Sequence, residues 1–133
     1  MLVGVVACVS TQVTTLAGFD PARRPTCAGV VQIYASPEAI KDSFIEIAYL
    51  QTGTTDPVSN DALLKNMREK AAQLGANGIL LRGFGSEHSV GIGTGIFTAK
   101  PTAAGVAIWV PRDTVALWER CAAMAAADPG VKP

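Results

Sequence analysis

The fold is decided by one continuous stretch, Leu63-Leu-Lys-Asn-Met-Arg-Glu-Lys-Ala-Ala-Gln-Leu-Gly-Ala-Asn-Gly-Ile-Leu-Leu81. Its first half repeats apolar residues at the spacing of one helical face, at Leu63, Met67, Ala71 and Leu74. Gly75 suits the left-handed position that ends a helix. After a short turn the chain enters 79–81, which is apolar enough to be a buried strand. The spacing therefore predicts a helix over 60–74 that leads directly into a strand.

Two strands are predicted before this helix. Gly29–Ala35 is rich in β-branched and aromatic residues, and Ser43–Leu50 alternates between two faces. Ser59, Asn60 or Asp61 can cap the helix. A strand, a helix and an immediate strand form a βαβ unit, so we expect the strands that flank the helix to run parallel.

Three more elements are predicted after it. Val90–Thr98 is a candidate strand within a glycine-rich region, and Ala104–Val110 is a strand stopped by proline. A final helix starts at Asp113 and runs to about residue 127, where we expect it to cover more of the sheet. The sequence thus predicts an α+β fold. It has a mixed sheet of four to five strands with a βαβ unit, one main helix packed on the sheet, and a C-terminal helix.

The 133 residues fit one domain, which we place at residues 29–127. Residues 9–28 are expected to be a linker or extended arm, with Arg23 and Arg24 solvated, and residues 128–133 to be a tail. We expect Trp109 and Trp118 to pack in the core. The net charge of zero gives no support for nucleic-acid binding.

The first residues, Met1-Leu-Val-Gly-Val-Val-Ala-Cys8, end an apolar run in a small residue and a cysteine. This pattern is similar to the lipobox of bacterial lipoproteins, which implies that Cys8 carries the lipid. Residues 1–8 would then be the end of a signal segment. No Lys or Arg precedes Cys8 and the apolar run is short, so the alternative is a buried strand over Leu2–Val9 in a cytosolic protein.

The chain has three cysteines. If Cys8 carries lipid, Cys27 and Cys121 remain as a pair that could form a disulfide in an oxidising compartment. The alternative is that both are buried free thiols.

The sequence offers no catalytic, cofactor or metal site. Gly91-Ile-Gly-Thr-Gly95 lacks the strand-to-helix context of a nucleotide-binding loop. His88 is the single histidine, and we expect it in a polar loop rather than paired with a cysteine as a base. The cysteines and His88 are too scattered for a zinc site.

The pattern over residues 29–82 resembles a group of small bacterial proteins. A strand ends near Ser36-Pro37, a strand contains Glu46-Ile-Ala48, and a helix closes in Ala71-Ala-Gln-Leu-Gly-Ala-Asn-Gly78. The group includes the YbjQ-type domains and the outer-membrane lipoprotein sensor of the Rcs envelope-stress pathway. The cysteine pattern of that sensor is not found here, so its disulfides and partners do not carry over. The resemblance supports a fold more than a function.

We therefore expect a non-enzymatic lipoprotein of the cell envelope that binds a partner protein or senses the state of the envelope. The lipid on Cys8 would be its sole membrane attachment, and it would face the periplasm. Val9 after Cys8 is not the aspartate that retains lipoproteins in the inner membrane, which favours the outer membrane. The alternative is a cytosolic YbjQ-like oligomer that binds a small ligand or a metal. In both cases the protein could form homo-oligomers.

Overall fold

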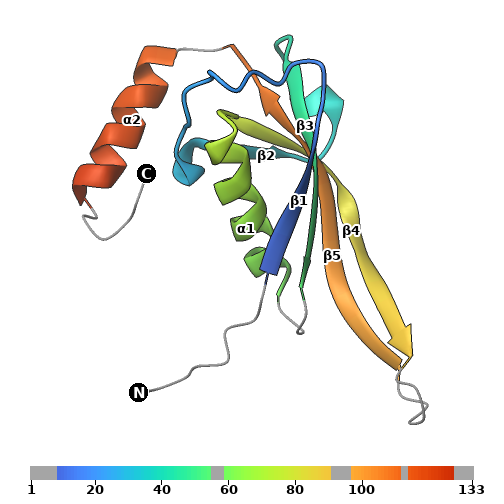
Figure 1. Ribbon diagram of the computed structural model, residues 1–133. Coiled ribbons are helices and arrows are strands. Elements are labelled where there is room, and N and C mark those ends of the chain that lie inside the picture. Colours follow the sequence, from blue (N-terminus) through green and yellow to red (C-terminus); the bar gives the residue numbers. More distant parts are fainter. Residues whose placement is uncertain (1–8, 55–58, 91–96, 112–113, 128–133) are drawn as a thin grey trace.

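The computed structural model describes residues 9–54, 59–90, 97–111 and 114–127, with only the backbone for 86–90 and 97–100. Nine elements follow one another along the chain (Figure 1). They are β1 (Val9–Thr15), the 3-10 turn η1 (Ala28–Val30), β2 (Gln32–Tyr34), the 3-10 turn η2 (Pro37–Ala39), β3 (Ile45–Thr54), α1 (Asn60–Gln73), β4 (Gly78–Val90), β5 (Phe97–Trp109) and α2 (Thr114–Ala127).

The strands form one mixed sheet in the order β1-β3-β5-β4-β2. β3 and β4 each pair antiparallel with β5, so they run in the same direction, as the βαβ unit predicts. β5 lies between them, which the sequence did not reveal. The pair β2–β4 is parallel and the pair β1–β3 is antiparallel. The predicted α+β class and the mixed sheet are confirmed.

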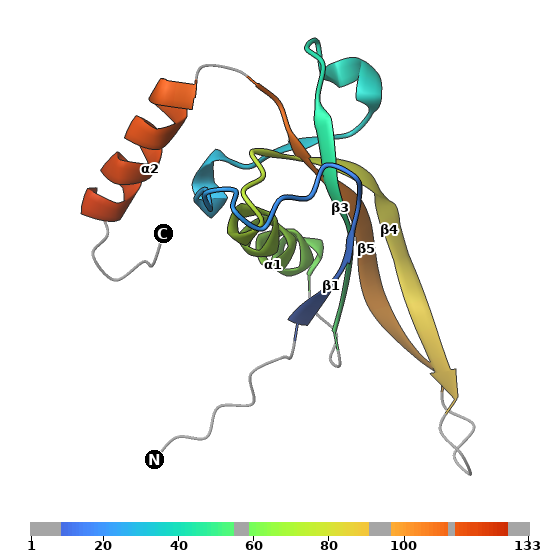
Figure 2. The same cartoon turned by 45° about the horizontal axis from the view of Figure 1, so that its top comes forward.

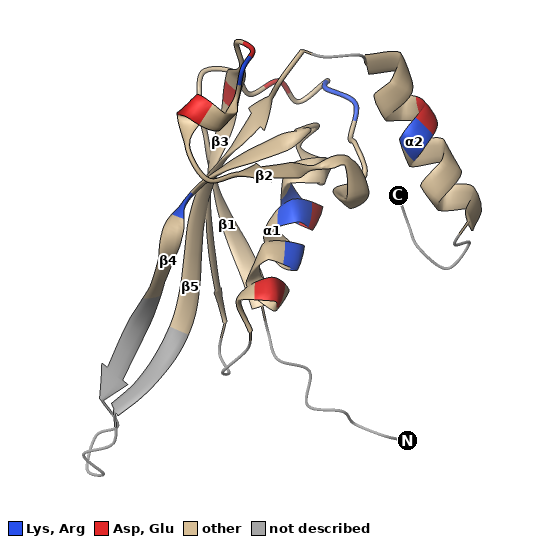
Figure 3. Ribbon diagram, turned by 180° about the vertical axis from the view of Figure 1, so that it is seen from behind, with Lys and Arg blue, Asp and Glu red and all other residues tan. Residues whose placement is uncertain are grey.

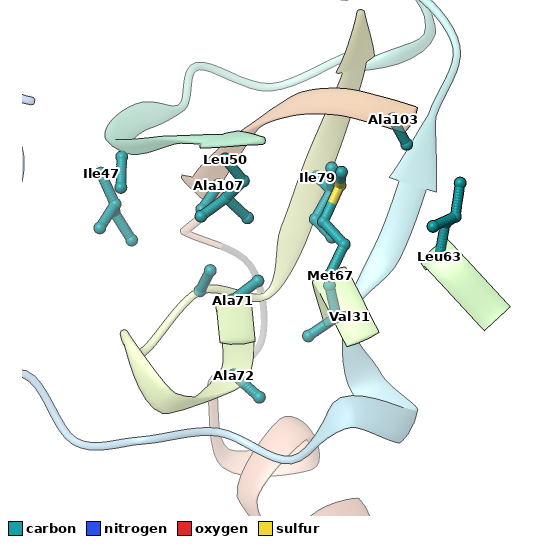
Figure 4. Close-up of a cluster of buried hydrophobic side chains, with 12 residues drawn as sticks. Val31, Ile47, Leu50, Leu63, Met67, Ala71, Ala72, Ile79, Ala103 and Ala107 are labelled. Atoms are coloured by element: carbon teal, nitrogen blue, oxygen red, sulfur yellow. The ribbon is translucent and has the colours of Figure 1, made fainter. Parts of the chain in front are cut away.

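Helix α1 packs on one face of the sheet, because Leu63, Met67 and Ala71 are fully buried there. In Figure 4, Met67 lies against Ile79, and Ala71 points toward the sheet. The facing positions on β5 are small, at Ala103, Gly105 and Ala107. A Cβ on Gly105 would come within 2.8 Å of Ile79 and 3.3 Å of the Met67 sulfur. Small residues on the central strand therefore let the helix approach closely.

The other face of the sheet has a second core that no long helix covers. Leu80, Val106, Ile108 and Val110 are buried there together with Ile40, which follows η2. Partly buried side chains from the connecting segments pack around them, at Leu16, Tyr34, Phe44 and Tyr49. The sheet is thus covered by a helix on one face and by loops on the other.

The turn between α1 and β4 has a clear physical basis. Gly75 takes φ +84°, the left-handed conformation predicted for it. The side chain of Asn77 then forms two hydrogen bonds with the backbone of Val110, as a residue of a neighbouring strand would. Its Nδ2 donates to the Val110 carbonyl and its Oδ1 accepts from the Val110 amide, both at 2.7 Å. At the start of α1, Ser59 is the cap, and its hydroxyl accepts from the Ala62 amide.

The prediction of a linker or extended arm over residues 9–28 is wrong for residues 9–15. Residues 9–15 form β1, which pairs along its whole length with β3. The side chains alternate between half-buried (Val9, Thr11, Val13) and exposed, but the run has too few apolar residues to stand out as a strand. The predicted strand over Gly29–Ala35 is shortened to β2, because η1 occupies its first residues.

Helix α2 does not cover the sheet, contrary to expectation. None of its residues is buried, and it stands beside η1, away from the sheet (Figure 1). A hollow of about 210 Å³ separates its first turns from β2 and Val110. The predicted cap residue Asp113 and the predicted tail 128–133 lie outside the described residues.

β4 and β5 continue beyond the rest of the sheet as a two-stranded arm. The pairing of β3 with β5 ends at Ala103, whereas β4 and β5 stay paired as far as Val90 and Phe97. Figure 2 shows the arm projecting from the body. His88 lies in β4 opposite Ala99, not in the loop that was predicted. Part of the glycine-rich segment, residues 91–96, lies outside the described residues.

We predict that Asn77→Ala lowers the free energy of unfolding by about 2–4 kcal/mol, because two hydrogen bonds are lost and the buried Val110 amide keeps no partner. Chemical denaturation measures this value. Asn77→Asp should also destabilise, since its second oxygen cannot donate to the Val110 carbonyl. Gln73→Ala, at the exposed last residue of α1, is the control. Its free energy of unfolding should stay within about 0.5 kcal/mol of the wild-type value. A wild-type stability for Asn77→Ala would contradict this account.

Candidate functional site

The candidate site is organised by residues 16–31, which we call the crossing segment because it passes over the end of α1 between β1 and β2 (Figure 1). Thr26 is buried within it. The Thr26 amide donates to the Ala72 carbonyl at 2.9 Å, and its hydroxyl donates to the Ala76 carbonyl at 2.5 Å. Carbonyls at the end of a helix lack partners within the helix. The crossing segment therefore adds to the C-terminal cap of α1, since the amides of Gly75 and Ala76 already bond to the carbonyls of Ala72 and Ala71.

Arg23 and Arg24 are not simply solvated, as the sequence suggested. The Arg23 guanidinium lies over the Trp109 ring, 5.5 Å from its centroid, and its aliphatic stem covers Gly75. The Arg24 guanidinium lies 4.2 Å from the centroid of the Trp118 ring, on α2. Both tryptophans are half-buried: Trp109 packs against the main core, as expected, and Trp118 lies on α2. Such contacts contribute about 0.5–1 kcal/mol each at exposed sites, and here they join β5 and α2 to the crossing segment.

The covalent link between the crossing segment and α2 is a disulfide between Cys27 and Cys121. Their Cα atoms are 5.7 Å apart, although 94 residues separate them in the sequence. Met124, one turn further along α2, places its sulfur 3.9 Å from that of Cys27 and packs over Gly29. The pairing that the sequence left open is thus present in the structure, and it holds α2 in place.

A groove lies between α1 and α2, with the crossing segment as its floor. We call it the interhelical groove; its volume is about 630 Å³. Its lining is formed by Pro25, Thr26, Cys27, Ala28 and Gly29 of the crossing segment, by Lys65, Glu69, Ala72 and Gln73 of α1, and by Cys121, Met124 and Ala125 of α2. The disulfide and Met124 give it an apolar centre.

The rim of the groove on the side of α1 is charged. A second hollow of about 500 Å³ continues the groove along α1, sharing Lys65 and Glu69 and adding Asp61, Leu64 and Arg68. Figure 3 shows acidic and basic residues along α1, whereas α2 carries one short charged stretch, Glu119-Arg120. An apolar centre beside mixed charges suits an amphipathic partner segment better than a uniformly charged ligand.

The other residues singled out in the sequence are not brought together. Cys8 lies outside the described residues, and the side chain of His88 is not described. Cys27 and Cys121 hold each other as a disulfide, so neither sulfur is a thiolate available for nucleophilic chemistry. No three His, Cys, Asp or Glu side chains converge as a metal site in the described parts of the chain. In those parts, no helix has the length and apolar character needed to cross a bilayer.

The groove was not predicted from the sequence. Nothing set Lys65 and Glu69 apart from other charged residues of a helix, and Arg23-Arg24 was expected to be solvated. The spacing of Cys121 and Met124 places both on one face of α2, but it does not show what that face contacts.

We predict that loss of the disulfide frees α2 while the sheet stays folded. An isolated helix of 14 residues is marginal in water, and this one buries no residue. In Cys27→Ala/Cys121→Ala, trypsin cleavage at Arg120 should become faster by about tenfold or more, because local opening costs little. Mass spectrometry of timed digests follows the rate. Cleavage at Lys70 in α1 is the internal control and should stay slow. Equal rates at Arg120 in variant and wild type would contradict the role of the disulfide.

No family model matches the chain, and the search of curated proteins finds no match. Among solved structures, the chain is similar to the Francisella virulence factor FvfA. The TM-score is 0.48 and the sequence identity 18%, over 74% of this chain and 96% of that one.

Proposed function

We propose that this protein is a non-enzymatic lipoprotein of the bacterial cell envelope, attached by a lipid on Cys8, whose domain binds a partner protein through the interhelical groove. The observation that carries the proposal is the disulfide between Cys27 and Cys121. Disulfides that hold a fold together form in oxidising compartments and are rare in the cytosol. The pairing also leaves Cys8 as the single cysteine outside the disulfide, which fits a lipidated residue.

The start of β1 adds a geometric consequence to the proposal. β1 begins at Val9, so no linker separates a lipid on Cys8 from the domain. The Val9 carbonyl is bound at 3.2 Å by the side-chain amide of Asn66 in α1, which fixes the first residue of the strand. A lipidated Cys8 would therefore hold the domain directly at the membrane surface, with a fixed orientation. The outer membrane, facing the periplasm, is the proposed location.

The partner proposed for the groove is an amphipathic segment of another envelope protein. Its apolar side would contact the disulfide and Met124, which is 39% exposed although it is a large apolar residue. Its polar side would carry an acid and a base opposite Lys65 and Glu69 on α1. Helix-in-groove recognition uses this combination of an apolar stripe and charged flanks.

Lipid attachment gives the most direct test. We predict that the protein made from its own gene in its own host is found in the membrane fraction, with Cys8 as its first residue and an added acyl mass. Cys8→Ser should abolish the acyl mass and leave the membrane fraction without the mature form. Cys121→Ala, which changes another cysteine, is the control and should leave the lipid in place. Fractionation and intact mass measure both.

An unlipidated protein that keeps Met1 or the residues next to it, in the soluble fraction, would overturn the proposal. The YbjQ-like alternative, a cytosolic oligomer that binds a small ligand or a metal, would then lead.

The groove has its own prediction. A photo-crosslinking amino acid in place of Lys65 should form one discrete protein adduct in cells. The same amino acid in place of Lys41, an exposed position away from the groove, should form none. Adding Met124→Glu to the Lys65 probe should abolish the adduct, because it places a charge in the apolar centre. Equal adducts from both positions, or an adduct that survives Met124→Glu, would contradict binding in the groove.

A further inference from the structure

β1 is an edge strand of the sheet. Among the strands that the structure describes, it lies next to β3 alone. The Leu16 amide, just beyond its end, donates to the Ile47 carbonyl of the strand next to it at 2.9 Å. In an antiparallel pair the residues that bond to the neighbour alternate, so the even-numbered residues of β1 face β3. The backbone groups of Thr11, Val13 and Thr15 therefore point away from the sheet.

Edges of this kind are normally protected, and β1 carries none of the usual protective features in its own sequence. Proteins blunt them with lysine, proline, bulges or short length, because an open row of amides and carbonyls binds other strands. β1 is Val9-Ser-Thr-Gln-Val-Thr-Thr15, seven residues with no charge, proline or glycine. Its register with β3 runs without a shift, so no bulge bends it away. The opposite edge strand, β2, has three residues.

The edge of β1 adjoins a hollow on the side of α1. A hollow of about 270 Å³ lies between β1 and α1, lined by Ser10 and Thr11 on one side and by Asn66, Glu69, Lys70 and Gln73 on the other. Asn66 accepts from the Thr11 hydroxyl at 2.6 Å and donates to the Val9 carbonyl, so the wall of the hollow is fixed. Helix α1 therefore borders this edge and binds its first residue.

The chemistry of the edge fits a second copy of the same strand. Antiparallel pairing about a two-fold axis at Gln12 places Thr11 opposite Val13 of the partner subunit, and Ser10 opposite Thr14 of the partner subunit. The outward backbone groups of the odd-numbered residues then bond to each other in both copies. No like charges meet, because β1 has none. The hollow beside β1 carries one acid and one base, Glu69 and Lys70. Bringing the hollows of two copies together therefore places no net charge at the interface.

We propose that two copies of this chain pair through β1, antiparallel and two-fold symmetric, so that their sheets join into one continuous sheet. The contact is isologous, which is the commonest form of protein dimer. It uses the edge of β1, whereas the interhelical groove lies between α1 and α2; the hollow beside β1 and the groove share Glu69 and Gln73 of α1. It does not depend on the lipid or on the partner proposed above.

The test uses the complete chain with its disulfide formed. Sedimentation is measured from about 5 to about 200 µM, because an interface of one strand pair is small and weak. Wild type should shift from monomer to dimer over this range. Gln12→Lys and Gln12→Glu should each remain monomeric, since like charges meet across the two-fold axis. An equimolar mixture of the two variants should dimerise again, at least as strongly as wild type.

Gln51→Lys is the matched control. Gln51 is exposed on the same face and is the partner of Gln12 in β3, one strand in from the edge. This variant should dimerise as wild type does. A wild type that stays monomeric throughout would overturn the proposal and leave the edge to an extended segment of another protein. Dimers of Gln12→Lys as strong as those of wild type would also overturn it.

Discussion

The disulfide between Cys27 and Cys121 is the link on which the position of α2, and with it the interhelical groove, depends. α2 buries none of its residues, and a hollow separates its first turns from the sheet. The Arg24–Trp118 stacking and the packing of Met124 over Gly29 also connect it to the body. The disulfide thus holds α2 where it forms one wall of the interhelical groove.

Helix α1 serves three surfaces at once. Its buried face, with Leu63 and Met67 at the centre, packs on small residues of β5 and forms the main core. One flank, with Lys65 and Glu69, is the charged rim of the interhelical groove. The other flank, with Asn66 and Lys70, borders the open edge of β1. The two candidate interaction surfaces therefore lie on the same helix and meet at Glu69 and Gln73, which line both.

The sequence predicted the features of the fold that neighbouring residues determine. The apolar spacing of α1, the Ser59 cap, the left-handed Gly75 and the entry into β4 all follow from residues close together in the chain. It could not predict that β5 lies between β3 and β4, because periodicity identifies strands but not their order. β1 was missed because its run of Thr, Ser and Gln is typical of a loop. Its strand conformation depends on pairing with β3, which is distant in the sequence. The groove was missed because it joins residues 94 positions apart through a disulfide that spacing alone cannot establish.

The oxidation state of Cys27 and Cys121 in the cell shows directly whether the disulfide exists in the native protein. Protein taken from its own host is alkylated without reduction, then reduced and alkylated with a second, heavier reagent, and its peptides are weighed. The account predicts that the peptides containing Cys27 and Cys121 carry the second reagent alone. Both cysteines carrying the first reagent would show free thiols in the native protein, and would contradict an oxidised envelope domain built around this bond.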